Sequence, residues 1–513
     1  MRDGKCRITL RRLCRMAMLP ECLVQLIWEF LPIYDGVMLS RSSRDLNRAL
    51  QKEVNSVRML RRIAKIDGMC MDSQLWQVRS LRSANAVSLR VEAVPLIHNK
   101  LTEVCGAVKF FLQCSQAQIL ELSDGICAFA LESILMSARQ NSFQTLSLTN
   151  VMGYRICNRQ IRACLSELAK FHTREISIVE TYIDFETLSY LLLAISRVQC
   201  LGTIKICKTW IQASQSGHLA HAIRGCSQIC ITKCGLTSEH VYLLSPVFEA
   251  SNVRKLDLSY NAINCNGVNQ LFVALSRAKR HVLAALKLEG TFDFVDDEDG
   301  HHWDREIFDT FCKSQSGLEH LNLSANYLDD TFVCDNKKAI SRLKKLQTLR
   351  LACNCIGDDG VYQLSRFKNR LVKLDLKENS IKMVSITHLT TRLFHHLEQL
   401  DLGETKLSSG TLVTLADCAR KGLAFTNLRH LSMENCDFSD PHASLVFDVI
   451  LGVSRLVFLS LEYNSFSDVS HKFFCDELER ENITERRICI WMPDNPIIVI
   501  SDVPAPHCII TQY

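Results

Sequence analysis

The sequence LQTLRLACNCI at residues 346–356 recurs as LVKLDLKENSI at 371–381 and as LEQLDLGETKL at 397–407. Each copy has leucine at positions 1, 4 and 6, Asn or Thr at position 9 and an apolar residue at position 11. The residues at position 9 are Asn354, Asn379 and Thr405. Self-similarity at a fixed spacing of about 20–50 residues indicates a stacked array of repeats.

Leucines that alternate with other residues predict a short strand with one buried face in each copy. A single copy cannot bury its leucines alone, so neighbouring copies are expected to stack into one continuous core. The Asn at position 9 can satisfy backbone groups where the chain turns away from the strand.

Copies of the same phrase occur through most of the chain. They start at Ala86, Ala117, Phe143, Thr173, Leu201, Cys226, Val253, Leu283, Leu318, Leu346, Leu371, Leu397, Leu428 and Leu456, with a degraded copy at Glu485. The mean step is about 28 residues. Between copies lie stretches with leucines at helical spacing, such as GVNQLFVALSRA at 267–278 and GVYQLSRF at 360–367.

This pattern resembles the leucine-rich repeat proteins, and a strand plus a full helix at this period resembles their ribonuclease-inhibitor-like subclass. The resemblance implies an α/β solenoid, a curved horseshoe with parallel strands inside and helices outside. The copies before Val253 depart from the pattern, because Thr181 and Cys234 stand where Asn is typical.

Residues 18–50 predict three short helices that share an apolar stripe. The pattern LPxxLxxxIxxFLPxxDxxxLSxxSRxLN resembles the F-box, by which substrate receptors dock on the adaptor subunit of cullin-RING ubiquitin ligases. By this resemblance the adaptor-binding residues are Leu19, Pro20, Leu23, Ile27, Phe30, Leu31, Leu39 and Leu46. Leu46 departs from the family, which usually has Trp there. The alternative is a helical cap that seals the end of the solenoid.

We therefore expect five segments. They are a basic N-terminal segment at 1–17, an F-box-like module or cap at 18–60, a connecting helix at 61–85, about 15 repeats at 86–495 and a C-terminal tail at 496–513.

Side chains that flank the buried leucine of each strand are expected on the inner face of the solenoid. They carry both charges with few aromatic rings, which favours a protein partner over a small molecule. The candidate partner-binding residues are Arg350, Lys373, Asp375, Lys377, Asp401, His430, Glu434 and Phe458.

The step from Leu283 to Leu318 is longer than the mean and contains the acidic sequence FDFVDDEDGHHWD at 292–304. Its acids and histidines are of the types that bind divalent ions, but their spacing is not that of a calcium-binding loop. A metal site, a partner-contact loop and a solvated strand-to-helix loop are the alternatives.

Composition limits the remaining classes of function. A net charge of +5, from 60 basic and 55 acidic residues, gives no case for nucleic acid as a partner. The 24 cysteines follow the repeat phase without paired C-x-x-C spacing, so we expect small buried residues and a reducing compartment, the cytoplasm, with the nucleus left open. No apolar run of membrane-spanning length is present.

The Arg-rich N-terminus is similar to a mitochondrial presequence, an alternative we disfavour because a folded module is predicted directly after it.

No sequence signature of catalysis is present: there is no P-loop, no G-x-S-x-G and no H-E-x-x-H. His395 and His396 precede a repeat start and are expected in a helix-to-strand turn. We expect no cofactor and no enzyme activity. The sequence therefore favours an F-box-type substrate receptor that binds its substrate protein on the repeats. The alternative is a scaffold or regulator of a cytoskeletal or signalling assembly.

Overall fold

The computed structural model describes residues 63–67, 88–92, 119–122, 134–136, 143–150, 165–180, 183–278, 283–292, 304–382, 395–405, 407–422, 425–481, 488–492, 495 and 508–511. The chain divides into two compact units, Met1–Cys226 and Ser227–Tyr513. The F-box-like residues and the segment 1–60 lie outside the described residues.

The first unit contains parallel strands with helices between the later ones. Its elements are β1 (Ile63–Asp67), β2 (Ser88–Glu92), β3 (Ile119–Leu122), β4 (Phe143–Thr149), β5 (Thr173–Val179), α9 (Phe185–Ile195), β6 (Thr203–Cys207) and α10 (Ser216–Ile223). Each strand pairs in parallel with the next from β1 to β6. The pairing aligns Leu120, Leu146 and Ile176, which all take position 4 of the repeat.

The second unit repeats a short strand and a helix more regularly. Its strands are β7 (Gln228–Thr232), β8 (Lys255–Asp257), β9 (Ala285–Lys287), β10 (His320–Asn322), β11 (Thr348–Arg350), β12 (Lys373–Asp375), β13 (Gln399–Asp401), β14 (His430–Ser432), β15 (Phe458–Ser460), β16 (Ile488–Trp491) and β17 (Cys508–Thr511). Its helices are α11 (Ser238–Ala250), α12 (Asn264–Ser276), α13 (Arg305–Ser314), α14 (Asp330–Ile340), α15 (Asp358–Ser365), α17 (Ser409–Arg420), α18 (Ala443–Gly452) and α19 (Asp468–Arg480).

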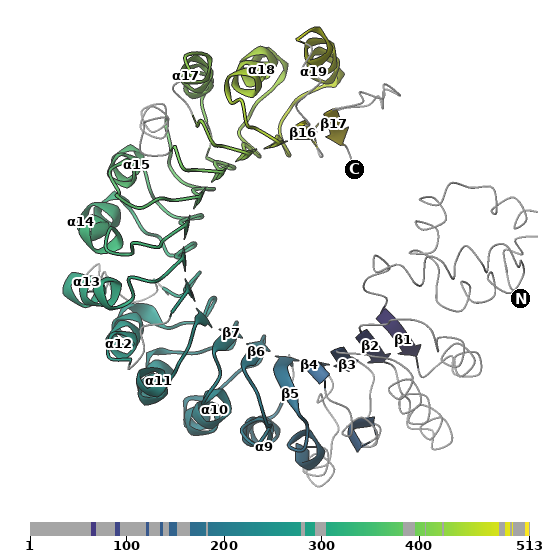
Figure 1. Ribbon diagram of the computed structural model, residues 1–513, viewed down its shortest axis with the longest axis vertical. Coiled ribbons are helices and arrows are strands. Elements are labelled where there is room, and N and C mark those ends of the chain that lie inside the picture. The colour runs from purple at the N-terminus through teal and green to yellow at the C-terminus, as the bar shows by residue number, and fades with distance from the viewer. Residues whose placement is uncertain are drawn as a thin grey trace, which may run out of the picture. The chain divides into compact units, whose positions relative to one another are not determined.

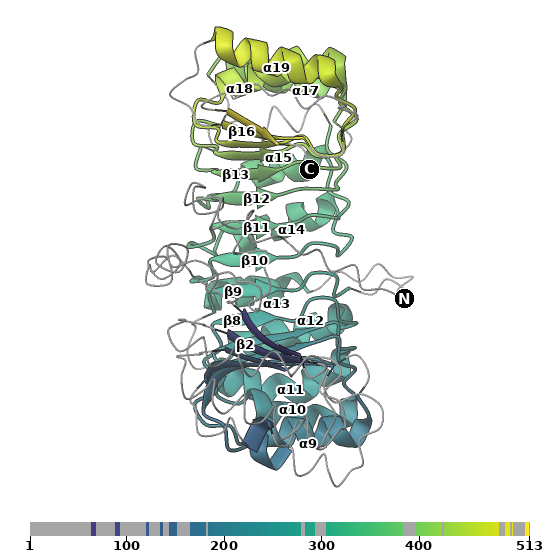
Figure 2. The same ribbon diagram turned by 90° about the vertical axis from the view of Figure 1, so that its right-hand side faces the viewer.

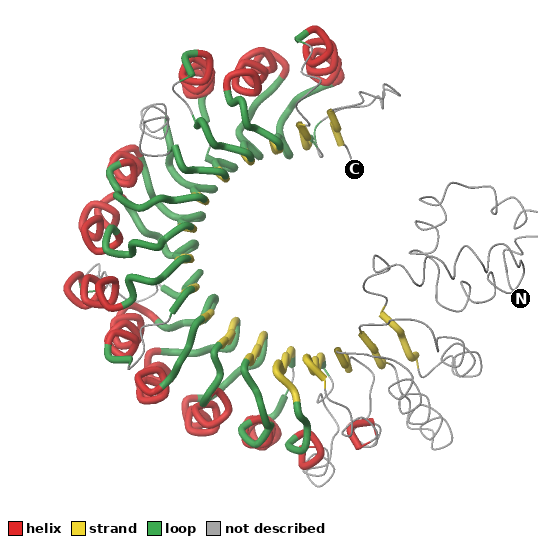
Figure 3. The backbone as a smooth tube through the Cα atoms, in the orientation of Figure 1, coloured by secondary structure: helices red, strands yellow, loops and turns green. Residues whose placement is uncertain are grey.

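Within the second unit the strands line the concave side and the helices cover the convex side (Figure 1). Seen from the side, strands β8 to β16 lie one above another like rungs (Figure 2). Loops on both edges of the sheet join each strand to its helix and each helix to the next strand (Figure 3). The predicted α/β solenoid is confirmed.

The core of each repeat consists of the leucines that the sequence marks. In the repeat of β11, Leu346, Leu349 and Leu351 are all buried. Parallel pairing keeps Leu349 opposite Leu374 and Leu374 opposite Leu400, so the same repeat position packs in every layer. The large aromatic residues Phe272, Phe308 and Phe311 fill the layer between α12 and α13, with ring centroids 4.6–6.1 Å apart.

Asparagine at position 9 ties each repeat to the one before it. Asn354 Oδ1 accepts hydrogen bonds from the backbone N–H groups of Asn326 and Leu328, at 3.0 and 2.9 Å. Its Nδ2 donates to the carbonyls of Leu323 and Leu351, at 3.1 and 2.9 Å. Asn261, Asn326, Asn379, Asn464 and Asn495 make the same kind of contact in their own layers. Buried backbone groups need hydrogen-bond partners. The need to pair the N–H and C=O groups of this turn therefore explains the Asn at position 9.

Where Asn is absent, a smaller side chain caps its own turn, and in some repeats it also contacts a neighbouring repeat. Thr405 Oγ1 donates to the Leu402 carbonyl at 2.6 Å, and Thr291 Oγ1 donates to the Leu288 carbonyl at 2.9 Å. Cys234 Sγ donates to the Thr232 carbonyl at 3.2 Å. Thr291 Oγ1 also lies 3.4 Å from Asn326 Oδ1, and Cys436 Sγ donates to the Leu402 carbonyl of the preceding repeat at 3.4 Å. Thr and Cys thus replace part of the Asn network.

Position 8, directly before this residue, has left-handed backbone in successive repeats. The φ angle is +57° at Tyr260, +54° at Cys353, +56° at Glu378 and +56° at Glu404. Non-glycine residues pay a steric penalty there. This backbone conformation is kept despite the penalty because the turn directs the Asn at position 9 into the core.

The structure differs from the sequence-based expectation in four places. Strand β1 lies within 61–85, where we expected a connecting helix, and β17 lies within the tail at 496–513. In the last repeat Ile490 pairs with Leu459, so the copy begins two residues later than Glu485. Cys353 and Cys355 are exposed rather than buried, because they flank the buried Asn354.

Candidate functional site on the concave face of the second unit

The concave face presents two rows of side chains in register. One row runs from Arg350 through Asp375 to Asp401, on strands β11, β12 and β13. The other runs through Thr348, Lys373, Gln399, His430 and Phe458. Each flanks a fully buried leucine, so the side chains are held at fixed spacing by a rigid sheet. The structure brings the sequence-predicted residues Arg350, Lys373, Asp375, Asp401, His430 and Phe458 onto five neighbouring strands.

Asp375 and Asp401 face each other as like charges on adjacent strands. Burial raises the pKa of Asp375, and the neighbouring Asp401 carboxylate raises it further. The opposing influences are the backbone N–H of Lys377 and the cations Arg350 and Lys373. Asp401 Oδ1 accepts a hydrogen bond from the backbone N–H of Gly403 at 3.0 Å. Like charges directly opposite each other on paired strands are destabilising, so this pair costs the fold energy.

Arg350 and Lys373 stand beside this acidic pair without a hydrogen-bonded side-chain partner among the described residues. Both are half-exposed. Their charges act on Asp375 at longer range and remain available to a ligand.

Lys377 and Glu434 differ from the other predicted residues because they follow their strands and pair with each other. Lys377 Nζ lies 2.8 Å from Glu434 Oε1 and 2.9 Å from Glu404 Oε1. Burial lowers the pKa of Lys377, but the hydrogen bonds to both carboxylates outweigh it and hold the pKa above its usual value. Glu404 was not among the sequence candidates. The sequence signal that could have identified Glu404 is its place at position 8 of the repeat LEQLDLGETKL.

An aromatic end follows this charged region. The rings of His430 and Phe458 lie 5.9 Å apart, and the Trp491 indole donates to Glu462 at 3.2 Å. Burial lowers the pKa of His430, and the nearby cations Arg429 and Lys373 lower it further. Neutral imidazole beside a phenyl ring makes this end less polar than the strands before it.

The other end of the concave face is internally paired. Lys287 Nζ lies 3.1 Å from Asp257, and the Tyr260 hydroxyl donates to Glu289 at 2.5 Å. The hydrogen bond to the Glu289 carboxylate raises the pKa of Tyr260 to about 12. Asn322 Nδ2 also donates to Glu289, at 2.9 Å. These charges already have partners, so they offer less to a ligand than the strands β11 to β13.

The remaining candidates give no second site among the residues that the structure describes. Residues 293–303 of the acidic insertion lie outside the described residues, and Asp304 caps α13 by accepting from the N–H groups of Glu306 and Ile307. In the parts of the chain that the structure describes, no group of three His, Cys, Asp or Glu side chains is placed to hold a metal ion. His395 and His396 lie in a turn before Leu397, as expected.

No helix among the described residues combines the length and the apolar character that a membrane span needs.

Comparisons with known proteins agree with this architecture. A family model described as leucine-rich repeat matches residues 342–365. The chain is 28% identical over 179 residues to the mouse NACHT, LRR and PYD domains-containing protein 14, covering 34% of this chain and 18% of that protein. It is 26% identical over 294 residues to the mouse NACHT, LRR and PYD domains-containing protein 5, covering 56% of this chain and 22% of that protein. The chain therefore spans about a fifth of the length of these curated relatives.

Two solved structures are similar in part. The crystal structure of the internalin inlF from Listeria monocytogenes has a TM-score of 0.38 and 17% identity, covering 66% of this chain and 85% of that one. The crystal structure of a TLR13–ssRNA13 complex has a TM-score of 0.35 and 15% identity, covering 84% of this chain and 56% of that one.

The repeat phrase, the parallel strands and the matching family model together define the chain as a leucine-rich repeat protein.

Proposed function

We propose that this chain is a non-catalytic protein-binding scaffold or regulator of a signalling assembly, and that it binds its partner on the concave face of residues 227–513. The observation that carries the proposal is the pair of cations Arg350 and Lys373, which lie beside Asp375 and Asp401 and have no hydrogen-bonded side-chain partner among the described residues. A rigid surface that presents cations and carboxylates without ion pairs among the described residues favours a protein ligand of complementary charge. The similarity of part of the chain to the mouse NACHT, LRR and PYD domains-containing proteins 14 and 5 supports a signalling context.

The partner is expected to contact both signs of charge at once. Its acidic groups would lie against Arg350 and Lys373, and a basic group would lie between Asp375 and Asp401. A cation at that place would relieve the repulsion between the two carboxylates. Binding would therefore release an unfavourable interaction that the free protein retains.

Affinity purification of the full chain followed by mass spectrometry tests this proposal. The variant Arg350→Glu/Lys373→Glu is expected to lose the partners that the unmodified chain retains. A matched control is Lys313→Glu/Lys338→Glu, which makes the same charge change at exposed residues of α13 and α14 on the convex side. Retention of the same partners by the concave-face variant would contradict the proposal.

An F-box-type substrate receptor is the second candidate, and the observation that favours it is the matching pattern at residues 19–47. Under this hypothesis the N-terminal residues dock a ubiquitin-ligase adaptor while the repeats bind the substrate. A chain that lacks residues 1–60 distinguishes the two functions. Adaptor and cullin subunits retained by the full chain alone would support the receptor, and their absence from both would leave the scaffold.

The cytoplasm is the proposed location. Cys226, Cys234, Cys312 and Cys436 are buried as free thiols, an arrangement suited to a reducing compartment. Burial raises the pKa of Cys226 and of Cys436 to about 11 in each case, which keeps these thiols unreactive.

A further inference from the structure

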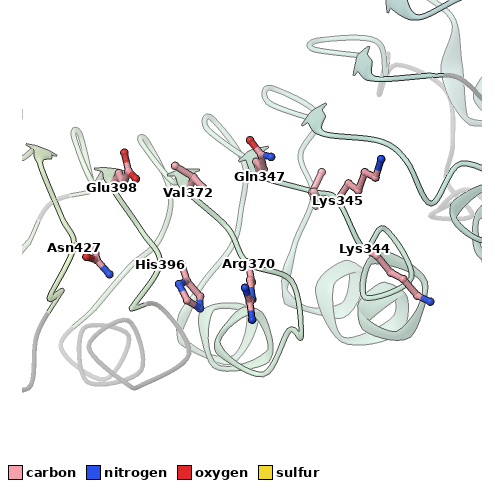
Figure 4. A pocket seen from close by; sticks show the side chains of 9 residues that line it. Lys344, Lys345, Gln347, Arg370, Val372, His396, Glu398 and Asn427 are labelled. Carbon is pink, nitrogen blue, oxygen red and sulfur yellow. The ribbon is translucent and has the colours of Figure 1, made fainter.

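A pocket lies on the edge of the second unit where helices return to strands. Its volume is about 560 Å³, and it is lined by Lys344, Lys345, Leu346, Gln347, Arg370, Val372, His396, Glu398 and Asn427. Figure 4 shows Arg370 and His396 side by side on the helix side of the pocket, while Gln347, Val372 and Glu398 lie near the strands. The pocket spans successive repeats and is separate from the rows on the concave face.

Its basic side comes from one repeated position, the residue directly before the first leucine. In five successive repeats this residue is Lys345, Arg370, His396, Asn427 and Arg455. None of them is acidic, and all carry nitrogen donors. Asn427 is held in place, because its Nδ2 donates to the His395 carbonyl and its Oδ1 accepts from Arg455, both at 2.6 Å.

Helix capping does not account for these cations. Interaction with a helix dipole is confined to the last turn, yet Lys345 lies beyond the end of α14 at Ile340, and Arg370 lies beyond the end of α15 at Ser365. Cations nearer the helices form ion pairs instead. Arg342 pairs with Asp309 at 2.6 Å, and Arg420 pairs with Asp417 at 2.8 Å. Lys344, Lys345 and Arg370 have no ion-pair partner among the described residues.

We propose that this pocket binds an acidic segment of a partner protein, with carboxylates of that segment against Lys345 and Arg370. Charge complementarity selects the ligand, since Glu398 at the strand side is the one carboxylate in the lining. Val372 and Gln347 offer contacts for the apolar and backbone parts of a peptide. The lining has no Phe, Tyr or Trp on which nucleic-acid bases could stack, which favours a peptide over single-stranded nucleic acid.

Fluorescence polarisation of the full chain tests the pocket directly. The probe is a labelled peptide of alternating glutamate and serine, compared with the same peptide carrying glutamine in place of glutamate. We expect the acidic peptide to bind more tightly, and we expect binding to weaken as salt rises because the charges are exposed. The variant Lys345→Glu/Arg370→Glu is expected to lower affinity by roughly tenfold or more, since it replaces attraction with repulsion.

The matched control is Lys368→Glu/Lys421→Glu, which reverses two exposed charges outside the pocket lining and is expected to bind within about threefold of the unmodified chain. Equal binding of the two peptides, or an equal loss in both variants, would overturn the proposal. Tighter binding of a single-stranded oligonucleotide, lost in Lys345→Glu/Arg370→Glu, would also overturn it in favour of a nucleic-acid ligand. Because Arg350 and Lys373 lie outside this pocket, failure here leaves the proposed function untouched.

Discussion

Cys353 and Cys355 are both exposed and lie on either side of the buried Asn354, yet only Cys353 has an acidic partner described for its thiol. Partial removal from water raises the pKa of Cys353 to about 12, together with a hydrogen bond from its Sγ to Glu378 Oε2 at 2.9 Å. Because the thiolate is the nucleophile, exposure alone does not make this cysteine reactive.

We predict that iodoacetamide at about pH 8 modifies Cys355 at least roughly tenfold faster than Cys353. Labelling followed by tandem mass spectrometry gives both rates in one experiment. The variant Glu378→Gln is expected to accelerate Cys353 and to leave Cys355 unchanged. Equal rates at the two cysteines of the unmodified chain would show that the Glu378 contact does not control the thiol.

At this scale the sequence predicts which side chains share a face, but it does not predict their partners. Alternation around Leu349, Leu374 and Leu400 placed Arg350, Asp375 and Asp401 in one row, because a strand has a period of two. The contact of Lys377 with Glu404 joins residues in different repeats and depends on side-chain reach. The contact of Tyr260 with Glu289 was missed for the same reason.

Helices α17 and α18 approach each other closely at Gly452. A Cβ atom at this position would lie 2.4 Å from the carbonyl carbon and 2.5 Å from the carbonyl oxygen of Ala419, so the backbone of one helix would have to move. Gly217 in α10 differs, because a Cβ there meets nothing within 4 Å.

We predict that Gly452→Ala lowers the free energy of unfolding by about 1–3 kcal/mol through overpacking. Gly217→Ala is expected to be neutral or to raise it by up to about 1 kcal/mol, since alanine favours a helix over glycine. Urea denaturation followed by circular dichroism compares both variants with the unmodified chain. A loss of the same size in both would indicate that the contact with Ala419 is not the cause.

Elements with strong periodicity could be predicted from the sequence, and their ends could not. The stretch predicted as helical at 267–278 overlaps α12, which begins at Asn264 and ends at Ser276. The stretch at 360–367 overlaps α15, which begins at Asp358 and ends at Ser365. Both helices begin with polar residues that carry no apolar period. Strand β1 was missed because IAKID has no leucine phrase and follows a basic stretch that favours a helix.

Along the second unit, each repeat that has Asn at position 9 bonds through it to the preceding repeat. Loss of one Asn should therefore weaken protection locally and leave distant layers intact. We predict that Asn354→Ala speeds amide hydrogen exchange at Asn326 and Leu328, whose N–H groups lose their acceptor.

Hydrogen-exchange mass spectrometry of peptides that cover 326–328 and 436–438 gives the comparison. Cys436 and Phe438 donate to Asn464 and serve as the internal control, because their acceptor is unchanged. Faster exchange in both peptides would show that the molecule opens as one cooperative unit, contrary to this prediction.

Strand register in the second unit does not depend on the length of chain between strands. Ala285 pairs with His320 after 35 residues, and Thr348 pairs with Lys373 after 25, yet both pairs are parallel and in the same repeat phase. Insertions and deletions during evolution can therefore accumulate in the connecting segments while the side chains of the concave face keep their spacing. A descendant of this protein could change its partner by single substitutions at those positions and inherit the framework unaltered.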